Sequence, residues 1–339
     1  MKKQNNKKQE LGIYYTPEVV VGFIFDILNI LKDKEDKEIH RWQSRKPQSH
    51  YPSVIDPACG EGIFLKKAVE SEFTGYHPKY KIPYIFGVDI DGTVVDRWEE
   101  ISILNLFHGN RKAMKTHFYH QNGLEELPKR TLLYKKGGLK EYDAVVGNPP
   151  YGGIGVDISK KEHSGVYNAL RQFEIYRYKG KRKKKGTSQM ALVGEAVVGE
   201  AVVGIGLDLS IKEAKSIPIE ILFVERFLQL CKPGGWIAII IPDGILSNST
   251  YHYVRQFIAE RAKVLAIVSL PRETFKQVGT TAKTSILFLQ KVKDKLLASE
   301  EDLDYPVFLA SINNIEKKNF DIIVKNFKSF IEKGVLTND

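Results

Sequence analysis

The sequence predicts an α/β fold in which helices cover both faces of a mostly parallel sheet. Residues 53–73 have the pattern of a strand, a glycine-bearing turn and a helix, and residues 84–107 repeat the order of strand and helix. The apolar run 142–147 is typical of a strand buried on both faces. Strands that alternate with helices in this way favour a parallel sheet.

The composition indicates a globular protein with an excess of positive charge. The chain has 339 residues, 42% hydrophobic and 27% charged, enough for one large domain with or without an appendage. The net charge of +10 favours an anionic partner, nucleic acid first, although a basic surface also serves solubility alone. Two cysteines make neither a disulfide framework nor a zinc set, so we expect a cytoplasmic protein without a metal. The longest apolar stretch is too short for a bilayer, so we expect no membrane association.

The N-terminal region begins with a polar, lysine-rich stretch over residues 1–10, which predicts a disordered tail. A helix is expected to follow, with Thr16 as its N-cap, Pro17 as its first residue and apolar residues on one face as far as Leu31. The charged residues 32–52 are expected to form a connection. An ordinary amphipathic helix is enough to explain this stretch.

The turn at residues 56–62, Asp-Pro-Ala-Cys-Gly-Glu-Gly, joins a strand to a helix. Such corners of α/β sheets bind nucleotide-type cofactors, and glycines let the backbone approach a ligand closely. The turn lacks the third glycine of a dinucleotide fingerprint and the Gly-Lys-Ser/Thr of a phosphate loop. Asp56 can instead hold an ammonium group. Asp89 ends the next strand, where such folds bind ribose hydroxyls, and Asp91 is interpreted as a helix cap.

The buried run 142–147 ends in Asn148-Pro149-Pro150-Tyr151. The Asn148 side-chain oxygen and the Pro149 carbonyl can each accept one N–H of an exocyclic amine. Pro150 has no N–H, and its ring restricts Pro149 to an extended conformation that can aim this carbonyl outward. Tyr151 offers a face for stacking an aromatic ring. The alternative is an ordinary turn between a strand and a loop.

Four motifs in this order resemble the amino-group DNA methyltransferases that make N6-methyladenine: residues 15–17 (Tyr-Thr-Pro), 56–62, 87–89 (Gly-Val-Asp) and 148–151. The resemblance covers about residues 11–292. The position of the first motif is similar to type I modification subunits and fused type IIG enzymes, in which the recognition domain comes last.

This resemblance implies a class I S-adenosylmethionine-dependent methyltransferase fold, Rossmann-like, with an antiparallel hairpin at the sheet edge. It implies a site-specific adenine-N6 methyltransferase that flips its target base out of double-stranded DNA, in a restriction-modification system. A specificity subunit or recognition domain is then the expected partner, because no room for one is seen in this sequence.

The resemblance also assigns roles to individual residues. The residues expected to bind S-adenosylmethionine are Tyr15, Thr16, Asp56, Ala58, Gly60, Gly62, Asp89, Ile90, Asn122 and Asn148. Among them, Asp56 and Thr16 would hold the methionine part, Asp89 the ribose, and Asn122 would lie near the adenine. Asn122 stands where relatives usually have Asp, and Gly123 stands where some have an aromatic residue.

The residues expected in catalysis are Asn148, Pro149, Pro150, Tyr151 and Phe275. Asn148 and the Pro149 carbonyl would hold the target amine, and Tyr151 and Phe275 would stack on the two faces of the flipped base. Phe275 has a plain alternative as a core residue. Lys283 is expected either to touch a phosphate or to be a solvated turn lysine.

The second half of the chain is expected to continue the sheet after an insert over about residues 152–217. The insert contains the basic run 177–185, which either lies on a phosphate backbone or is a solvated loop, and a tandem Val-Gly-Glu-Ala-Val repeat over 193–202 without a chemical role. The elements expected after it are helices 219–228 and 248–261 and strands 236–241, 264–270 and 286–289. Residues 293–339 are expected to form a C-terminal extension, with one strand at 307–310, that begins a target-recognition region.

Two other functions fit part of the sequence. The Asn-Pro-Pro-Tyr motif alone is shared with protein-glutamine and RNA amino-group methyltransferases, but the Tyr-Thr-Pro motif and the basic insert disfavour these. A non-catalytic DNA-binding subunit is disfavoured by the completeness of the motifs. The target sequence, the oligomeric state and a companion nuclease leave no recognisable pattern in these residues.

Overall fold

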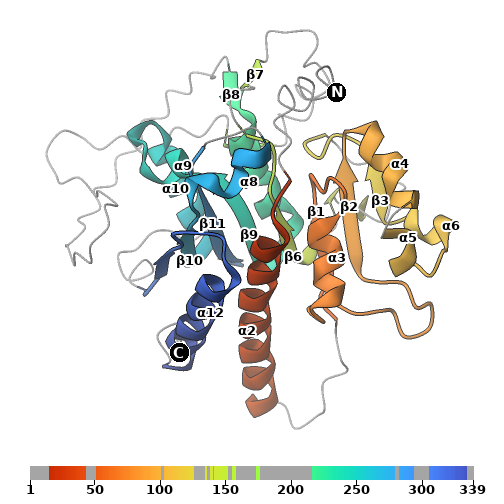
Figure 1. The fold of residues 1–339 in the computed structure, drawn as a ribbon, viewed down its shortest axis with the longest axis horizontal. Coiled ribbons are helices and arrows are strands. Elements are labelled where there is room, and N and C mark those ends of the chain that lie inside the picture. Colours follow the sequence, from red (N-terminus) through yellow and green to blue (C-terminus); the bar gives the residue numbers. More distant parts are fainter. Residues whose placement is uncertain are drawn as a thin grey trace, which may run out of the picture.

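The computed structural model describes residues 15–42, 51–100, 103–125, 134–135, 138–139, 141–151, 155–157, 173–175, 216–278, 282–293 and 305–333. Within these residues one eight-stranded sheet has the order β12-β10-β11-β9-β6-β1-β2-β3 (Figure 1). Its strands are β1 (Val54–Asp56), β2 (Ile85–Asp89), β3 (Phe118–His120), β6 (Tyr142–Gly147), β9 (Cys231–Pro242), β10 (Ala262–Ser269), β11 (Thr284–Lys291) and β12 (Phe308–Ser311). Two short pairs lie apart from it: β4 (Tyr134–Lys135) with β5 (Gly138–Leu139), and β7 (Gly155–Asp157) with β8 (Ser216–Pro218).

The sheet is mostly parallel, as predicted. The strands from β3 through β2, β1 and β6 to β9 pair in parallel. The strand β11 is antiparallel to both β9 and β10, which confirms the predicted antiparallel pair. The strand β12 then pairs in parallel with β10 and takes the outermost position. This sheet confirms the predicted fold class.

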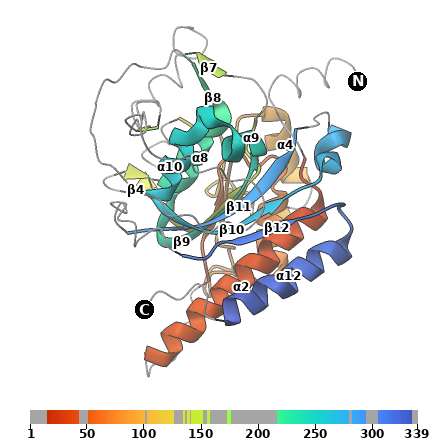
Figure 2. The same ribbon diagram turned by 90° about the vertical axis from the view of Figure 1, so that its left-hand side faces the viewer.

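Helices cover both faces of the sheet. One face packs against α2 (Glu18–Trp42), α3 (Ile63–Glu70), α4 (Gly92–Glu100), α5 (Ile103–Leu106), α6 (Arg111–Met114) and α12 (Lys317–Glu332). The other face packs against α8 (Ile219–Leu230), α9 (Asp243–Ser247) and α10 (His252–Ala259). Figure 2 shows α2 and α12 side by side below the sheet, and α8 and α10 above it. Two short 3-10 helices, η2 (Ser249–Tyr251) and η3 (Arg272–Val278), complete these elements.

Several predicted element boundaries were wrong. The helix α2 continues to Trp42 through the stretch expected to be a connection, whose Lys, Glu and Asp residues are compatible with an exposed helix. Of the predicted helix over 93–107, the structure describes α4 to Glu100 and α5 from Ile103 to Leu106, and a turn begins at Phe107. The predicted helix from residue 248 begins later, at His252. The Asn248 side chain accepts a hydrogen bond from the Thr250 N–H and caps η2 instead.

The segment expected to be a C-terminal extension contributes β12 and α12 to the same sheet and helix layer. Phe320 of α12 packs against Phe23 of α2 with ring centroids 5.1 Å apart. Phe308 of β12 packs edge-on against Phe327 at 5.2 Å. The described part of this segment therefore shares the core of the eight-stranded sheet.

Three predictions fall on residues that the structure does not describe. The N-terminal tail, the basic run 177–185 and the tandem repeat 193–202 lie outside the described residues. In the part of the chain that is described, none of the helices has the length and apolar character needed to cross a membrane.

Candidate methyltransferase site

A cavity of ≈ 240 Å³ opens where the carboxyl ends of β1, β2 and β6 lie next to one another. Parallel α/β sheets bind ligands at this edge. Residues from all four predicted motifs line it: Tyr15, Thr16, Asp56, Pro57, Ala58, Cys59, Gly60, Glu61, Ile63, Phe64, Asp89, Ile90, Asn122, Gly123, Asn148, Pro150, Tyr151, Ile219 and Phe223. The sheet thus brings together residues that are up to 208 positions apart in the chain.

Asp56 ends β1 at the base of the cavity. Its side chain is buried, and Oδ1 accepts the Ala58 N–H at 2.9 Å. Burial, reinforced by the charge of Asp89 and only partly offset by this hydrogen bond, raises the pKa of Asp56 well above its ordinary value. Gly147 at the end of β6 makes this packing possible, because a Cβ there would lie 2.6 Å from Oδ1. A buried carboxylate at this place is a strong site for a cationic group.

Asp89 ends β2 and holds the glycine turn. Its Oδ2 accepts the Gly60 N–H at 2.7 Å, and its Oδ1 accepts the Asp91 N–H at 2.9 Å. Burial raises the pKa of Asp89 despite these hydrogen bonds. Gly60 has φ +52°, in the left-handed region that favours glycine, and its carbonyl accepts the Trp98 indole N–H at 2.8 Å. Asp91 caps α4 by accepting the Thr93 N–H at 3.0 Å.

The turn after β3 forms another wall of the cavity. The Asn122 side-chain oxygen accepts the Leu124 N–H at 3.0 Å, and the Asn122 backbone carbonyl accepts the Glu125 N–H at 3.0 Å. Gly123 lies directly against the Pro57 backbone, and a Cβ at this position would be 2.0 Å from the Pro57 carbonyl oxygen. This contact explains why no side chain can be accommodated at position 123 with this backbone.

The residues at the start of α2 connect the turn after β1 with the Asn-Pro-Pro-Tyr corner. The Thr16 hydroxyl accepts a hydrogen bond from the Asn148 side-chain amide at 3.1 Å. The Tyr15 hydroxyl donates to Glu61 Oε1 at 3.2 Å, and Glu61 is also paired with Arg97 of α4. The prediction that Thr16 caps α2 was wrong: the Pro17 carbonyl accepts the first helical N–H groups, from Val20 and Val21, and the Thr16 hydroxyl faces Asn148 instead.

Tyr151 and Phe275 lie together beside the cavity. Their rings are T-shaped, with centroids 6.4 Å apart, and both side chains are buried. Tyr151 lines the cavity, whereas Phe275 packs in the hydrophobic core on the α2 side of the sheet. Lys283, predicted to contact a phosphate or solvent, pairs with Asp243 at 3.4 Å.

Most of the predicted site residues line the cavity. Gly62, Pro149 and Phe275 do not. Gly62 instead precedes α3 with φ +83°, where the close approach of Ile103 also leaves no room for a side chain.

Sequence reasoning missed Glu61, and also Ile219 and Phe223 of α8, which follow the insert in the sequence and line the cavity. Only the tertiary structure brings α8 here, so no local sequence signal marks these two residues. Among the described residues no cluster of three His, Cys, Asp or Glu side chains is arranged to hold a metal ion.

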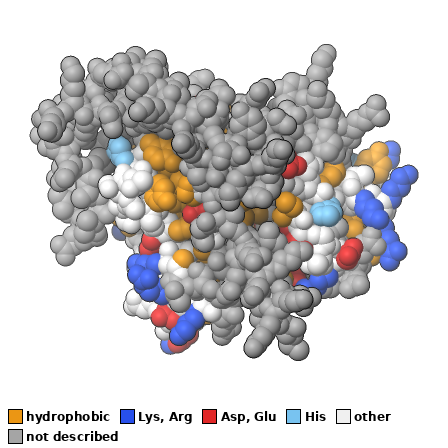
Figure 3. All heavy atoms as spheres, turned by 90° about the horizontal axis from the view of Figure 1, so that it is seen from above, with side chains coloured by type: hydrophobic (Ala, Val, Ile, Leu, Met, Phe, Trp, Pro, Cys, Tyr) orange, Lys and Arg blue, Asp and Glu red, His pale blue; other side chains and the backbone are white. Residues whose placement is uncertain are grey.

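The face seen from above in Figure 3 is the side on which α2 begins. In this view, described hydrophobic side chains cluster at the upper left, and Lys and Arg side chains lie together with Asp and Glu side chains at the lower left and at the right.

The eight-stranded sheet has the fold of class I methyltransferases. The chain belongs to the N-6 DNA methylase family, which it matches over residues 1–176 and 211–336. It is 22% identical over 218 residues to the type II methyltransferase M.TthHB8I of Thermus thermophilus, covering 62% of this chain and 34% of that enzyme. A stretch of 69 residues is 32% identical to the defense against restriction protein B of Escherichia phage P1, of which it covers 3%. The chain therefore spans at most about a third of these two relatives.

Solved structures show the same fold. A class I S-adenosylmethionine-dependent methyltransferase from Listeria monocytogenes aligns with a TM-score of 0.54 at 19% identity, covering 93% of this chain and 71% of that one. A modification subunit of a type I restriction enzyme from Vibrio vulnificus aligns with a TM-score of 0.52 at 17% identity, covering 96% and 54%. The agreement over nearly the whole chain confirms the class I methyltransferase fold.

Proposed function

We propose that this protein is a site-specific DNA methyltransferase that transfers a methyl group from S-adenosylmethionine to the N6 amine of a flipped-out adenine. One observation carries the proposal. A single cavity joins the carboxylates of Asp56 and Asp89 to Asn148, Pro150 and Tyr151 of the Asn-Pro-Pro-Tyr motif. A cofactor corner and an amine-binding corner that share a cavity can hold the two reactants next to each other.

The donor set fits S-adenosylmethionine. Asp56 is a buried carboxylate suited to the ammonium group of the methionine part, and Asp89 presents a carboxylate suited to ribose hydroxyls. Ile90, 54% exposed at the cavity, offers an apolar surface for the adenine, near Asn122. The bound cofactor supplies a methyl group on a positively charged sulfur. Tyr15, Thr16, Ala58 and Gly60 complete the surface proposed to bind it.

The Asn-Pro-Pro-Tyr corner is proposed to bind the target amine. An exocyclic amine on an aromatic ring is a poor nucleophile because its lone pair is conjugated with the ring. The Asn148 oxygen and the Pro149 carbonyl would each accept one N–H, which favours a tetrahedral nitrogen whose lone pair points toward the methyl group. The hydrogen bond from the Asn148 amide to Thr16 leaves the amide oxygen as the acceptor in this arrangement.

Base flipping is needed because a duplex hides the N6 lone pair, and extrusion costs a few kcal/mol. Stacking on Tyr151 and Phe275 is proposed to offset about 1–3 kcal/mol for each ring. The two rings are in T-shaped contact, so a base that stacks between them must first separate them. We therefore propose that base entry moves Tyr151 away from Phe275.

The proposed partner is double-stranded DNA, with a specificity subunit or domain that reads the sequence. The net charge of +10 suits a polyanion. Among the structures that share the fold, one is a modification subunit of a type I restriction enzyme. Another, with a TM-score of 0.52 at 12% identity, is the type ISP restriction-modification enzyme LlaGI with a DNA substrate mimic.

The test is nucleoside mass spectrometry of DNA from a bacterium that lacks adenine methylation and expresses this chain, with Asn148→Ala as control. The wild type is expected to produce N6-methyladenine. Asn148→Ala is expected to bind S-adenosylmethionine nearly normally and to lose about 10²–10³-fold in transfer, because it lacks one acceptor for the amine. Equal losses of cofactor binding and transfer would contradict the role proposed for Asn148.

The other outcomes separate the alternatives. Cofactor binding without DNA methylation points to a missing specificity partner, or to a protein-glutamine or RNA substrate, which a substrate panel identifies. The absence of both binding and methylation by the wild type overturns the proposed enzyme and favours a non-catalytic DNA-binding subunit.

A further inference from the structure

Helix α8 carries a fully buried arginine next to the cavity. Arg226 is 0% exposed, although arginine is among the side chains most costly to bury. It lies three residues after Phe223 and seven after Ile219, both of which line the cavity. These spacings place all three on the same face of the helix, so Arg226 lies one turn beyond the cavity wall.

The Arg226 guanidinium makes one hydrogen bond to the described residues. Its Nη2 donates to the Leu124 carbonyl at 2.7 Å, and its charged carbon lies 4.8 Å from the centre of the Phe173 ring. Nε and Nη1 are buried and donate to no described residue. The Phe173 ring and the charge of the neighbouring Glu225 offset only part of the cost of burying these two donors, so local energetics disfavour an arginine here.

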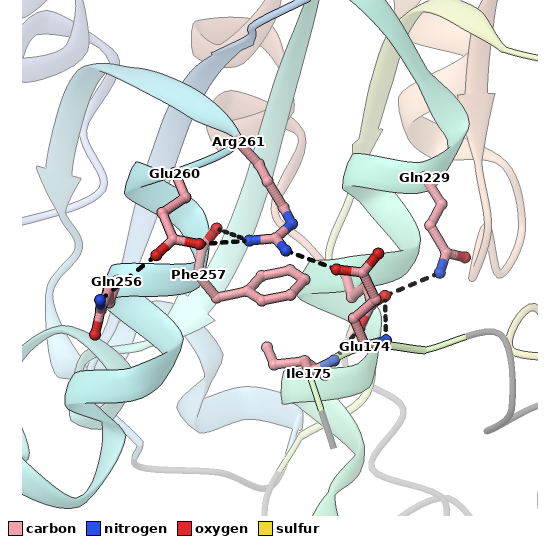
Figure 4. Close-up of polar contacts among 8 residues, drawn as sticks. Glu174, Ile175, Gln229, Gln256, Phe257, Glu260 and Arg261 are labelled. Atoms are coloured by element: carbon pink, nitrogen blue, oxygen red, sulfur yellow. Dashed lines mark hydrogen bonds and ion pairs between the residues drawn. The ribbon is translucent and has the colours of Figure 1, made fainter. Parts of the chain in front are cut away.

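The neighbouring acidic side chain is engaged elsewhere. Both Glu225 carboxylate oxygens accept backbone N–H groups, of Glu174 and Ile175, each at 2.7 Å. Figure 4 shows this cluster, with the Gln229 amide donating to it from α8 and Arg261 bound to Glu174. Glu225 thus anchors residues 174–175. Arg226 instead donates its hydrogen bond to the turn after β3.

That turn is held from two sides. Gly123 is in contact with the Pro57 carbonyl, and Leu124 receives the Arg226 hydrogen bond. Between these contacts, the Asn122 side chain accepts the Leu124 N–H and is fixed in orientation. A change at Leu124 is thus transmitted through one hydrogen bond to Asn122, which lines the cavity.

We infer that Arg226 is a positioning residue for the cofactor cavity. Its guanidinium holds the Leu124 carbonyl by a hydrogen bond and so fixes the turn 122–124, which sets the place of Asn122. The inference rests on the proposed function, in which this wall faces the adenine of S-adenosylmethionine. The arginine is retained for geometry at a cost in stability, a trade-off common at functional sites.

The test compares Arg226→Met with Arg261→Gln as a matched control. Arg261 also contacts a phenylalanine, Phe257, at 3.6 Å and pairs with Glu174, but it makes no hydrogen bond to the turn 122–124. Each purified full-length protein is titrated with S-adenosylmethionine by calorimetry, and its thermal unfolding is measured without cofactor.

Arg226→Met is expected to weaken S-adenosylmethionine binding about tenfold, while the ligand-free melting temperature stays the same or rises. Arg261→Gln is expected to lower the melting temperature and leave the dissociation constant unchanged. Arg226→Lys keeps the charge and one flexible donor, and is expected to recover part of the affinity. A purely structural role would move affinity and melting temperature together.

If the wild type binds S-adenosylmethionine and the dissociation constant of Arg226→Met is within twofold of the wild-type value, this inference is overturned and the proposed function is not. An equal loss of affinity in Arg261→Gln would also overturn the inference, because it would indicate general loosening of this side of the sheet. If Arg226→Met does not fold, Arg226→Lys decides: reduced affinity at an unchanged melting temperature supports the inference, and unchanged affinity overturns it. No binding by the wild type overturns the proposed function together with this inference.

Discussion

At the scale of single residues, the cavity is marked by two carboxylates that form no ion pair with a described cation. Asp56 and Asp89 both have a raised pKa because burial disfavours their charge, and each accepts backbone N–H groups rather than pairing with a described lysine or arginine. Their charges are costly in the ligand-free protein, and a cationic or hydroxyl-bearing ligand would offset that cost. This pattern is typical of a binding site rather than a structural ion pair.

Asp56→Asn is expected to stabilise the ligand-free protein and to weaken S-adenosylmethionine binding by at least about tenfold. Asparagine keeps an acceptor for the Ala58 N–H but removes the buried charge. Because the folded-state pKa of Asp56 is raised, its charge costs stability as the pH rises above the unfolded value of about 3.9. The melting temperature of Asp56→Asn should therefore exceed that of the wild type most near pH 7, and not at all below about pH 4.

A lower melting temperature for Asp56→Asn at pH 7 would contradict this account. It would mean that the carboxylate has a stabilising partner in the ligand-free protein. Calorimetry at pH 7 checks the loss of cofactor affinity independently of stability.

At the scale of elements, backbone contacts between turns shape the cavity. The turn after β3 and the turn after β1 touch through Gly123 and Pro57, and the ends of β6 and β1 touch through Gly147 and Asp56. Neither glycine belongs to a recognisable local motif. Each is needed because another segment of the chain occupies the space of a side chain.

Gly123→Ala is expected to destabilise the fold by about 2 kcal/mol or more and to impair cofactor binding. The added Cβ would lie 2.0 Å from the Pro57 carbonyl oxygen, so backbone on both sides must move. Gly22→Ala in α2 is the control, because nothing lies within 4 Å of its Cβ, and alanine favours a helix by up to about 1 kcal/mol. Urea unfolding of both variants makes the comparison. If Gly123→Ala and Gly22→Ala had the same free energy of unfolding, the turn after β3 would be able to relax around the added Cβ without cost.

A second contact between elements fixes β6 relative to its neighbours. The Asp143 carboxylate accepts the Ser53 N–H at 2.8 Å and the Ser53 hydroxyl at 2.5 Å, and it pairs with Lys232 at the start of β9. Burial alone would raise the pKa of Asp143, but Lys232 and Ser53 outweigh it, and the pKa is lowered. This residue thus holds the beginnings of three adjacent strands.

Asp143→Asn is expected to lower the free energy of unfolding at pH 7 by about 1–3 kcal/mol. A lowered folded-state pKa means that the carboxylate stabilises the fold above its unfolded pKa of about 3.9, and that this stability is lost as the pH falls through the folded value. The difference from the wild type in urea unfolding should therefore shrink below about pH 4. A difference that is constant with pH would exclude the charge as its cause.

At the scale of the whole molecule, the sheet extends beyond the expected catalytic domain. The strand β12 pairs with β10, and α12 packs on α2, so residues 305–333 share the core with the N-terminal helix. The start of α2 carries Thr16 and thus contacts Asn148. The two ends of the described chain are therefore joined in one helix layer that also reaches the cavity.

Truncation after Lys293 is expected to lower the melting temperature and to promote aggregation. It would uncover Phe23 and its apolar neighbours on α2 and leave β10 as an unprotected edge strand. Thermal unfolding and size-exclusion chromatography of the truncated protein check this. A truncated protein that is as stable as the full chain and binds S-adenosylmethionine equally well would instead support the separable extension that the sequence predicts.

The sequence alone was sufficient to predict the fold class, because buried parallel strands have continuous apolar runs and their ends carry recognisable turns. The run 142–147 became β6 with the same boundaries, and Asp56 and Asp89 end β1 and β2 as expected. Local sequence patterns of two to seven residues were enough to predict these strands and the residues at which they end. Together with the resemblance to amino-group DNA methyltransferases, these patterns predicted most residues that line the cavity.

Only the tertiary structure decided which distant segments share the cavity. Ile219 and Phe223 reach it because α8 crosses the sheet beside β6, and Arg226 follows them on the same helical face. The hydroxyl of Thr16 was predicted to cap a helix, yet it bonds to Asn148, which is 132 residues away. Such contacts depend on strand order and helix packing, and neither is encoded in the spacing of neighbouring residues.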